Sequence, residues 1–179
     1  MTADEKAYAR FLSGDEAGLT ELIEIYRKPL SDFINAYIKD EHDSQDIMLD
    51  VFVDLVRKNR FRGESSLKTY LFAVARNKAL KHISRKKAQT IEFEQAQNYI
   101  PLAADANAQL ISEEERQAVR SAVRSLKPEY REAIHLIYFE DMTYEQAAAV
   151  MRKSKKQISN YVFRAKQQLR EILKEEAGQ

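Results

Sequence analysis

The sequence predicts an all-α protein with two small helical domains joined by an extended acidic linker. Apolar residues recur at steps of three and four over most of its 179 residues, which is the spacing of one helix face. Gly and Pro number only 4 and 3, whereas helix formers such as Ala, Leu, Glu and Lys abound. The period is lost over residues 89–111, so we expect the linker there, between domains at 1–88 and 112–179.

Five helices are expected in the first domain. The apolar residues of the first three are Tyr8, Phe11 and Leu12; then Leu19, Leu22, Ile23 and Tyr26; then Phe33, Ile34, Tyr37 and Ile38. Pro29 separates the second helix from the third, because proline interrupts helical hydrogen bonding. The buried face of a helix at about 43–58 comprises Ile47, Val51, Phe52, Leu55 and Val56.

A loop at residues 59–66, NRFRGESS, leads into the fifth helix. The chain turns at Gly63, and Ser65 or Ser66 caps a helix that continues to about Lys87. Its core face is Leu67, Leu71, Val74 and Ala75. One flank carries Ser66, Tyr70, Asn77, Lys81 and Ser84, with added charge from Arg76, Arg85, Lys86 and Lys87. A loop beside such a flank suits holding an unpaired nucleobase by stacking and edge hydrogen bonds. The alternative is that Tyr70 is a core residue and the basic side chains are simply solvated.

The second domain is expected to contain four helices. Ser112 with Glu115 forms a capping-box pattern, and the helix that it opens faces inward with Val119, Ala122, Val123 and Leu126. Pro128 suits the first position of the next helix, whose apolar residues are Ile134, Ile137 and Tyr138. Thr143 with Gln146 and Ser154 with Gln157 open the last two helices, which a short turn separates. Ala147, Ala148 and Ala149 leave room for these two to cross closely.

Charge is nearly balanced overall but is distributed in blocks. Residues 57–88 carry 11 bases and one acid, and residues 152–170 carry seven bases and no acid, whereas residues 1–56 carry 5 bases and 13 acids. This asymmetry points to nucleic acid. The absence of Cys excludes disulfides and thiolate chemistry and fits a reducing cytosol. No apolar run approaches membrane-spanning length, so we expect no membrane insertion.

The last helix has the pattern of a recognition helix. One stripe consists of Ile158, Val162, Ala165, Leu169 and Ile172, and the opposite side carries Lys156, Ser159, Asn160, Phe163 and Gln167. Cations there suit phosphates, and short polar groups suit base edges; a basic solvated helix is the alternative. Arg152 stands near the turn where a left-handed Gly is usual, and we expect its guanidinium to reach a backbone phosphate.

The fourth helix carries an acidic ridge opposite its core stripe, made of Asp43, Asp46, Asp50 and Asp54. A solvated face and a docking surface for a basic or mixed partner are both consistent with it. Adjacent turns of one helix rarely enclose an ion, so we expect no metal site.

Taken together, residues 43–88, DSQDIMLDVFVDLVRKNRFRGESSLKTYLFAVARNKALKHISRKKA, and residues 126–173, LKPEYREAIHLIYFEDMTYEQAAAVMRKSKKQISNYVFRAKQQLREIL, strongly resemble the small extracytoplasmic-function (ECF) sigma factors of the sigma-70 family. The resemblance covers about residues 5–88 and 112–173. It implies a transcription initiation subunit that directs core polymerase to promoters. The first domain would be sigma region 2, which binds core polymerase and melts the −10 element, and the second would be region 4, which reads the −35 element.

The resemblance also assigns residues to these roles. Those expected to read the −35 element are Arg152, Lys153, Lys155, Lys156, Ser159, Asn160, Phe163 and Arg164. Those expected at the −10 element are Arg60, Arg62, Ser65, Ser66, Tyr70, Arg76, Asn77, Lys81 and Arg85. Those expected to bind core polymerase are Asp43, Asp46, Asp50, Phe52 and Asp54. Tyr70 stands where many members have Trp, and Lys81 where an acid is frequent.

The partners implied are bacterial RNA polymerase core, promoter DNA and an anti-sigma factor, in the cytoplasm. We expect neither a cofactor nor catalysis, because the three histidines are dispersed and no glycine-rich phosphate loop occurs. A regulator with an N-terminal sensor or dimerisation domain is an alternative, but it leaves the basic block at 57–88 unexplained. A nuclease is a third alternative, and no catalytic constellation supports it.

Overall fold

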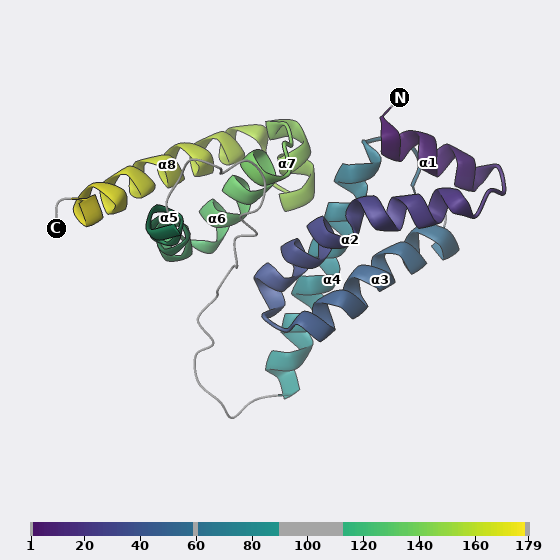
Figure 1. Ribbon diagram of the computed structural model, residues 1–179, viewed down its shortest axis with the longest axis horizontal. Helices are drawn as coiled ribbons and strands as arrows, with labels where there is room; N and C mark the ends of the chain where they lie inside the picture. The colour runs from purple at the N-terminus through teal and green to yellow at the C-terminus, as the bar shows by residue number, and fades with distance from the viewer. Residues whose placement is uncertain (1, 59–60, 90–112, 178–179) are drawn as a thin grey trace. The chain divides into compact units, whose positions relative to one another are not determined.

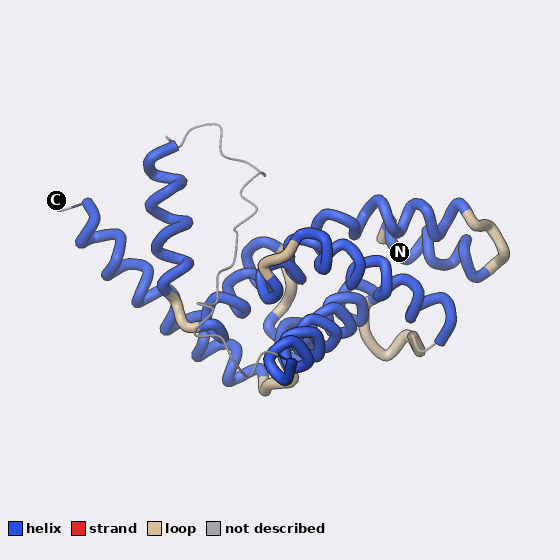
Figure 2. The backbone as a smooth tube through the Cα atoms, turned by 90° about the horizontal axis from the view of Figure 1, so that it is seen from below, coloured by secondary structure: helices blue, strands red, loops and turns tan. Residues whose placement is uncertain are grey.

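The computed structural model describes residues 2–58, 61–89 and 113–177, and these form helices joined by turns and short loops (Figures 1 and 2). No strand occurs among them, so the all-α prediction is confirmed. The chain divides into two compact units, Met1–Ala96 and Gln97–Gln179. None of the helices in the described ranges is long and apolar enough to cross a membrane. Ser112, Arg60 and nearly all of the expected linker lie outside the described residues.

The first unit is built around one long central helix. Its helices are α1 (Ala3–Leu12), α2 (Ala17–Ile38), α3 (Glu41–Lys58) and α4 (Leu67–Gln89). Helix α2 packs against the other three, and α3 also packs against α4. The largest fully buried side chains of this unit are Leu22, Leu30, Phe33, Ile34, Val51, Leu55, Leu67, Leu71 and Phe72.

The predicted helix boundary at Pro29 is wrong, because α2 continues through this residue. Tyr26, Leu30 and Phe33 are buried on one stripe that spans the proline. Burying a Leu or Phe side chain contributes about 1.5–3 kcal/mol, so two of them offset the roughly 3 kcal/mol that an internal proline costs. The proline leaves the Ile25 carbonyl without its helical partner, and Ile25 is 37% exposed, so this turn of α2 lies at the surface.

Helices α1 and α2 approach closely at Gly18. A Cβ atom on Gly18 would lie 2.3 Å from the Ala7 carbonyl oxygen and 2.6 Å from the Phe11 nitrogen. Only a residue without a side chain permits this distance, so the sequence position of Gly18 fixes where α1 crosses α2.

The second unit consists of α5 (Glu113–Ser125), α6 (Pro128–Ile134), the π-helical turn η1 (His135–Phe139), α7 (Tyr144–Met151) and α8 (Lys155–Ala177). Helix α8 packs against α5, α6 and α7. Pro128 opens α6 as predicted. Ala122, Val123 and Leu126 are buried as expected, but Val119 is exposed, so the expectation that it faces inward is wrong.

The π-helical turn was not predicted, because its pattern of apolar residues does not differ from that of an α-helix. The Glu140 N–H donates to the His135 carbonyl at 3.1 Å, five residues back, where an α-helix would bond four residues back. The His135 and Glu140 side chains are both buried, with Nε2 and Oε1 3.5 Å apart. This turn ends α6 and directs the chain into α7.

Candidate functional site

The recognition-helix prediction depends on α8 having one apolar and one polar face, and the structure has both. Ile158, Val162 and Ala165 are buried, and Leu169 and Ile172 are half-buried. The residues predicted on the opposite side are all exposed, namely Lys156, Ser159, Asn160, Phe163 and Gln167. Arg152, Lys153, Lys155 and Arg164 are exposed too.

A shallow hollow of about 510 Å³ lies on the exposed side of α8 near its N-terminus. Its lining consists of Ser154, Lys156, Gln157, Ser159, Asn160 and Phe163. These side chains offer an ammonium, hydroxyls and amides but no carboxylate, together with the ring of Phe163, which is 60% exposed. Such a surface can hydrogen-bond to base edges and contact the methyl group of thymine, while repelling no phosphate.

Both expected capping boxes that flank the turn before α8 are confirmed. The Thr143 N–H donates to Gln146 Oε1 at 2.8 Å, and the Gln146 N–H donates to Thr143 Oγ1 at 3.2 Å. Ser154 and Gln157 make the same exchange at 2.9 and 3.2 Å. These bonds define the start of each helix and so hold the angle of the turn between them.

Helix α7 ends on a left-handed arginine, the conformation considered for Arg152 from the sequence. Arg152 has φ 53° and ψ 47°, and its N–H donates to the Ala148 carbonyl. The Lys153 N–H bonds the same carbonyl at 3.0 Å. Lys155 hydrogen-bonds to Glu145, an interaction that holds the pKa of this carboxyl below its usual range. Lys155 is therefore less free for phosphate than Arg152 or Lys153.

In the first unit, Ser66 is the residue that caps α4. The Thr69 N–H donates to Ser66 Oγ at 3.2 Å, and the Ser66 and Thr69 hydroxyls are 2.8 Å apart. Ser65 and Arg62 are exposed in the loop that precedes the helix. The Ser66 hydroxyl is thus engaged in capping α4, and the exposed loop residues beside it are Ser65 and Arg62.

Tyr70 is neither a core residue nor a free one. It is half-buried, and the centre of its ring lies 5.4 Å from that of Phe61 in the loop. Asn77, Lys81 and Arg85 are exposed further along α4. Arg76 is half-buried, and successive helical residues point about 100° apart, so Arg76 does not share the flank of Asn77.

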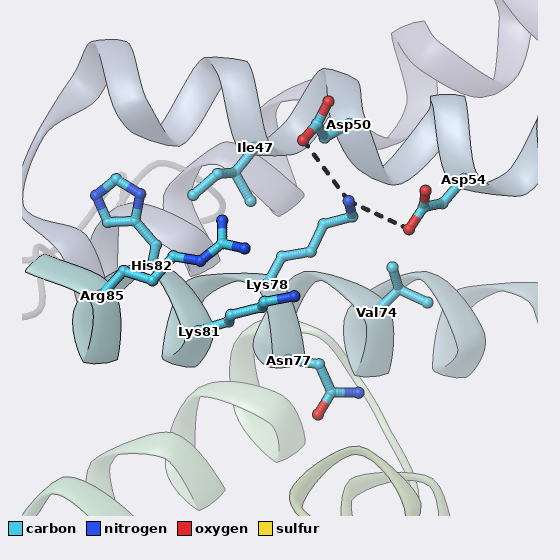
Figure 3. A pocket seen from close by; sticks show the side chains of 9 residues that line it. All are labelled: Ile47, Asp50, Asp54, Val74, Asn77, Lys78, Lys81, His82 and Arg85. Atoms are coloured by element: carbon cyan, nitrogen blue, oxygen red, sulfur yellow. Dashed lines mark ion pairs between the residues drawn. The ribbon is translucent and has the colours of Figure 1, made fainter.

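The acidic ridge of α3 faces α4 more than the sequence predicted. Figure 3 shows Lys78 reaching from α4 toward two carboxylates, with its Nζ 3.1 Å from Asp54 Oδ2 and 3.6 Å from Asp50 Oδ2. Asp43 Oδ2 lies 3.1 Å from His82 Nε2. Three of the four carboxylates therefore pair with the basic helix, and the expectation that all four lie opposite the core stripe is wrong.

A cleft of about 440 Å³ follows this pairing between α3 and α4. The side chains around it are Ile47, Asp50, Asp54, Val74, Asn77, Lys78, Lys81, His82 and Arg85 (Figure 3). Within the described ranges, no group of three His, Asp or Glu side chains is placed to hold a metal ion.

The apolar side chains on the surface of α3 differ from those expected. Phe52 is 3% exposed, so it packs in the core, as its place on the predicted buried face implies, and its docking role stays a prediction. Leu49, Val53 and Val56 are instead 50%, 41% and 41% exposed. Their spacing of four and three places them on one face of α3, and this spacing is visible in the sequence. The prediction that Val56 lies on the buried face is therefore wrong.

Comparison with known proteins identifies the family. Residues 22–89 match the model of Sigma-70 region 2, and residues 116–169 match that of Sigma-70 region 4. Both regions therefore occur in one chain, in this order, and together they include the exposed faces of α3, α4 and α8. The chain is an ECF sigma factor of the sigma-70 family.

Relatives of this sigma factor match along nearly their whole length. It is 25% identical over 155 residues to the ECF RNA polymerase sigma factor SigM of Bacillus subtilis (strain 168), which covers 86% of this chain and 94% of that protein. It is 25% identical over 174 residues to the ECF RNA polymerase sigma-E factor of Escherichia coli (strain K12), covering 92% and 91%.

A solved structure shares the fold of this sigma factor. The sigma factor RpoE of Bartonella quintana, in complex with the anti-sigma factor NepR, superposes with a TM-score of 0.66 at 24% identity, covering 87% of this chain and 96% of that one. As a sigma factor, the protein directs RNA polymerase core to promoters and initiates transcription there.

Proposed function

We propose that the two units divide promoter recognition, with residues 1–88 acting at the −10 element, residues 112–179 acting at the −35 element and residues 89–111 linking them. The observation that carries this division is the carboxylate-free hollow on the exposed side of α8, near the N-terminus of this helix. Ser159 and Asn160 read base edges there, and Lys156, Arg164, Arg152 and Lys153 contact phosphates. Lys155 supports the turn through Glu145.

The −10 element is captured by α4 and the loop before it. Tyr70 offers the uncovered part of its ring for stacking, and Asn77 and Lys81 are exposed beyond it. Arg62, Ser65 and Arg85 add charge and hydrogen-bonding groups along the same path of the DNA strand. Ser66 caps α4 and so fixes where this helix begins, and Arg76 lies on another side of the helix. Arg60 keeps its expected role at the −10 element. Stacking and edge hydrogen bonds need unpaired bases, so this surface acts on a melted strand.

Docking on core polymerase uses α3. Leu49, Val53 and Val56 supply exposed apolar area, and Asp46 and Asp50 flank them. Asp43 and Asp54 contribute less directly, because they pair with His82 and Lys78 of α4. An apolar centre bordered by charge is the usual composition of a specific interface.

The remaining roles follow from the family. We propose that this sigma factor has no catalytic activity of its own, works in the cytoplasm with RNA polymerase, and is held inactive by an anti-sigma factor. Support for the last comes from the relative solved with NepR, which is a sigma factor bound to its anti-sigma factor.

Titration of core polymerase against surface variants tests the docking proposal. Val53→Lys should weaken core binding at least about tenfold, since a charge in the apolar centre of an interface costs more than 1.4 kcal/mol. The matched control is Leu80→Lys, which places the same charge at an apolar residue of α4 that is 39% exposed. Equal affinity of the Val53 variant and the parent protein would remove α3 from the interface. Transcription from a linear promoter by the reconstituted holoenzyme tests the overall function.

A further inference from the structure

Three aromatic rings from separate parts of the first unit lie in a row. The ring centres of Tyr8 and Phe61 are 5.5 Å apart at 77°, an edge-to-face contact, and those of Phe61 and Tyr70 are 5.4 Å apart at 56°. Tyr8 belongs to α1, Phe61 to the loop and Tyr70 to α4. The row thus connects the N-terminal helix with the residue proposed to stack on a melted base.

Phe61 is the middle ring and belongs to the loop rather than to a helix. Helical hydrogen bonds therefore do not hold it, and its ring contacts with Tyr8 and Tyr70 restrain its position. Phe61 also covers part of the Tyr70 ring, which restricts the side from which a base can stack. Arg62 and Ser65 follow in the same loop, so fixing Phe61 also limits the positions that they sample.

Tyr8 anchors the far end of the row. It is 7% exposed, and α1 is itself held to α2 by the close crossing at Gly18. Burial raises the pKa of the Tyr8 hydroxyl, with a further contribution from Tyr70. Helix α1 precedes residue 22, where the match to the region 2 model begins, so nothing in that match assigns it a role.

We propose that Tyr8 is a positioning residue for −10 capture, acting through Phe61 to fix the ring of Tyr70 and the loop beside it. The inference rests on the proposed role of Tyr70. Preorganisation of this kind improves binding by removing the ordering cost that a mobile loop would incur. The part of Tyr8 that the proposal requires is its ring, which makes the edge-to-face contact with Phe61.

The test uses holoenzyme reconstituted with core polymerase and a promoter whose −10 element is pre-melted as a bubble. A set of such templates carries 2-aminopurine at successive positions of the non-template strand, and stacking on an aromatic ring quenches this base. Tyr70→Leu should lower bubble affinity about tenfold and abolish the quench at one position, as expected for loss of one stacked base. Tyr8→Leu should lower affinity roughly two- to tenfold, as for one aromatic pair, and weaken the same quench.

Two comparisons separate positioning from general loss of stability. Tyr8→Phe keeps the ring and should match the parent protein. Ile34→Val, a buried change in α2, should lower stability without altering the quench. The double variant Tyr8→Leu/Tyr70→Leu should bind no more weakly than Tyr70→Leu alone, because both act at one ring.

The outcomes distinguish the positioning role of Tyr8 from the −10 capture role of Tyr70. If Tyr70→Leu behaves like the parent protein, the role of Tyr70 in −10 capture is wrong and the inference falls with it. If Tyr70→Leu is impaired while Tyr8→Leu is not, or if the two losses add, Tyr70 captures the base without support from Tyr8. If Ile34→Val reduces the quench as much as Tyr8→Leu does, the effect of Tyr8 is only structural and the inference is overturned.

Discussion

Arg152 combines backbone strain with a surface charge, and replacing it by glycine should separate the two. A residue with a side chain costs about 1–2 kcal/mol in the left-handed conformation that Arg152 adopts, with φ 53° and ψ 47°. Glycine removes this strain but adds about 0.4–1 kcal/mol of freedom to the unfolded chain. The net expectation for Arg152→Gly is therefore a stabilisation of roughly 0.5–1 kcal/mol in the second unit.

Hydrogen exchange can follow each unit separately, which a single melting curve of a two-unit protein does not. Slowly exchanging amides of α7 and α8 should exchange roughly two- to fivefold more slowly in Arg152→Gly, given that 1.4 kcal/mol is tenfold. Lys39→Gly is the matched control: Lys39 ends α2 in the same conformation, with φ 61°, and its N–H donates to the Asn35 carbonyl at 3.0 Å. It should slow exchange in the first unit alone.

The same two variants differ in their expected effect on DNA. Loss of one phosphate contact should lower the slope of log affinity against log salt by about 0.9 for Arg152→Gly, for all promoter sequences alike. Lys39→Gly and the charge-retaining Arg152→Lys should keep the parent slope. Faster exchange in α7 and α8 would show that the left-handed turn is not strained. An unchanged salt slope for Arg152→Gly would show that its guanidinium touches no phosphate.

Three further changes test other parts of the structure. Asn160→Ala should relax preference at one base pair of the −35 element by about 1–3 kcal/mol with little change in salt slope, measured by competition between promoter variants. Gly18→Ala should destabilise the first unit by about 1–3 kcal/mol in urea, because its Cβ would meet the Ala7 carbonyl at 2.3 Å, whereas Thr20→Ala at an exposed site should not. Tyr26→Phe should cost about 1 kcal/mol at pH 7, because it removes a 2.6 Å hydrogen bond to Asp4. Partial burial raises the pKa of Asp4, but hydrogen bonds from Thr2 and Tyr26 outweigh it and leave the pKa below 3.8. The stability from this hydrogen bond is therefore present above pH 4 and is lost as the pH falls. At pH 3 the stabilities of the variant and the parent protein should differ less.

The features predicted correctly from the sequence are local ones. Capping at Thr143 and Ser154 depends on residues three apart, and the place of the turn at Arg152 follows from the short distance between two helix signals. The errors concern which helix lies beside which. Pro29 fails to end α2 because burial on both sides outweighs its local effect, and Val56 is exposed because no helix of the described unit covers that face of α3. Packing partners of this kind are not encoded within one helix.

The four carboxylates of α3 differ in how they pack against α4, so they are not equivalent as probes of docking. Asp54 and Lys78 have side chains only 20% and 24% exposed, so reversing the charge of Asp54 would place two cations together in a poorly solvated groove. Asp50 is 65% exposed and lies 3.6 Å from the same ammonium, so its pair contributes about 0–1 kcal/mol. Reversing the charge of Asp50 would still repel Lys78 and shift α4, which carries the proposed −10 surface. Asp46 lies on the side of α3 that carries Leu49 and Val53, and it is exposed. A loss of core binding in Asp46→Lys would therefore report docking itself, whereas the same loss in Asp50→Lys would combine docking with a displaced α4.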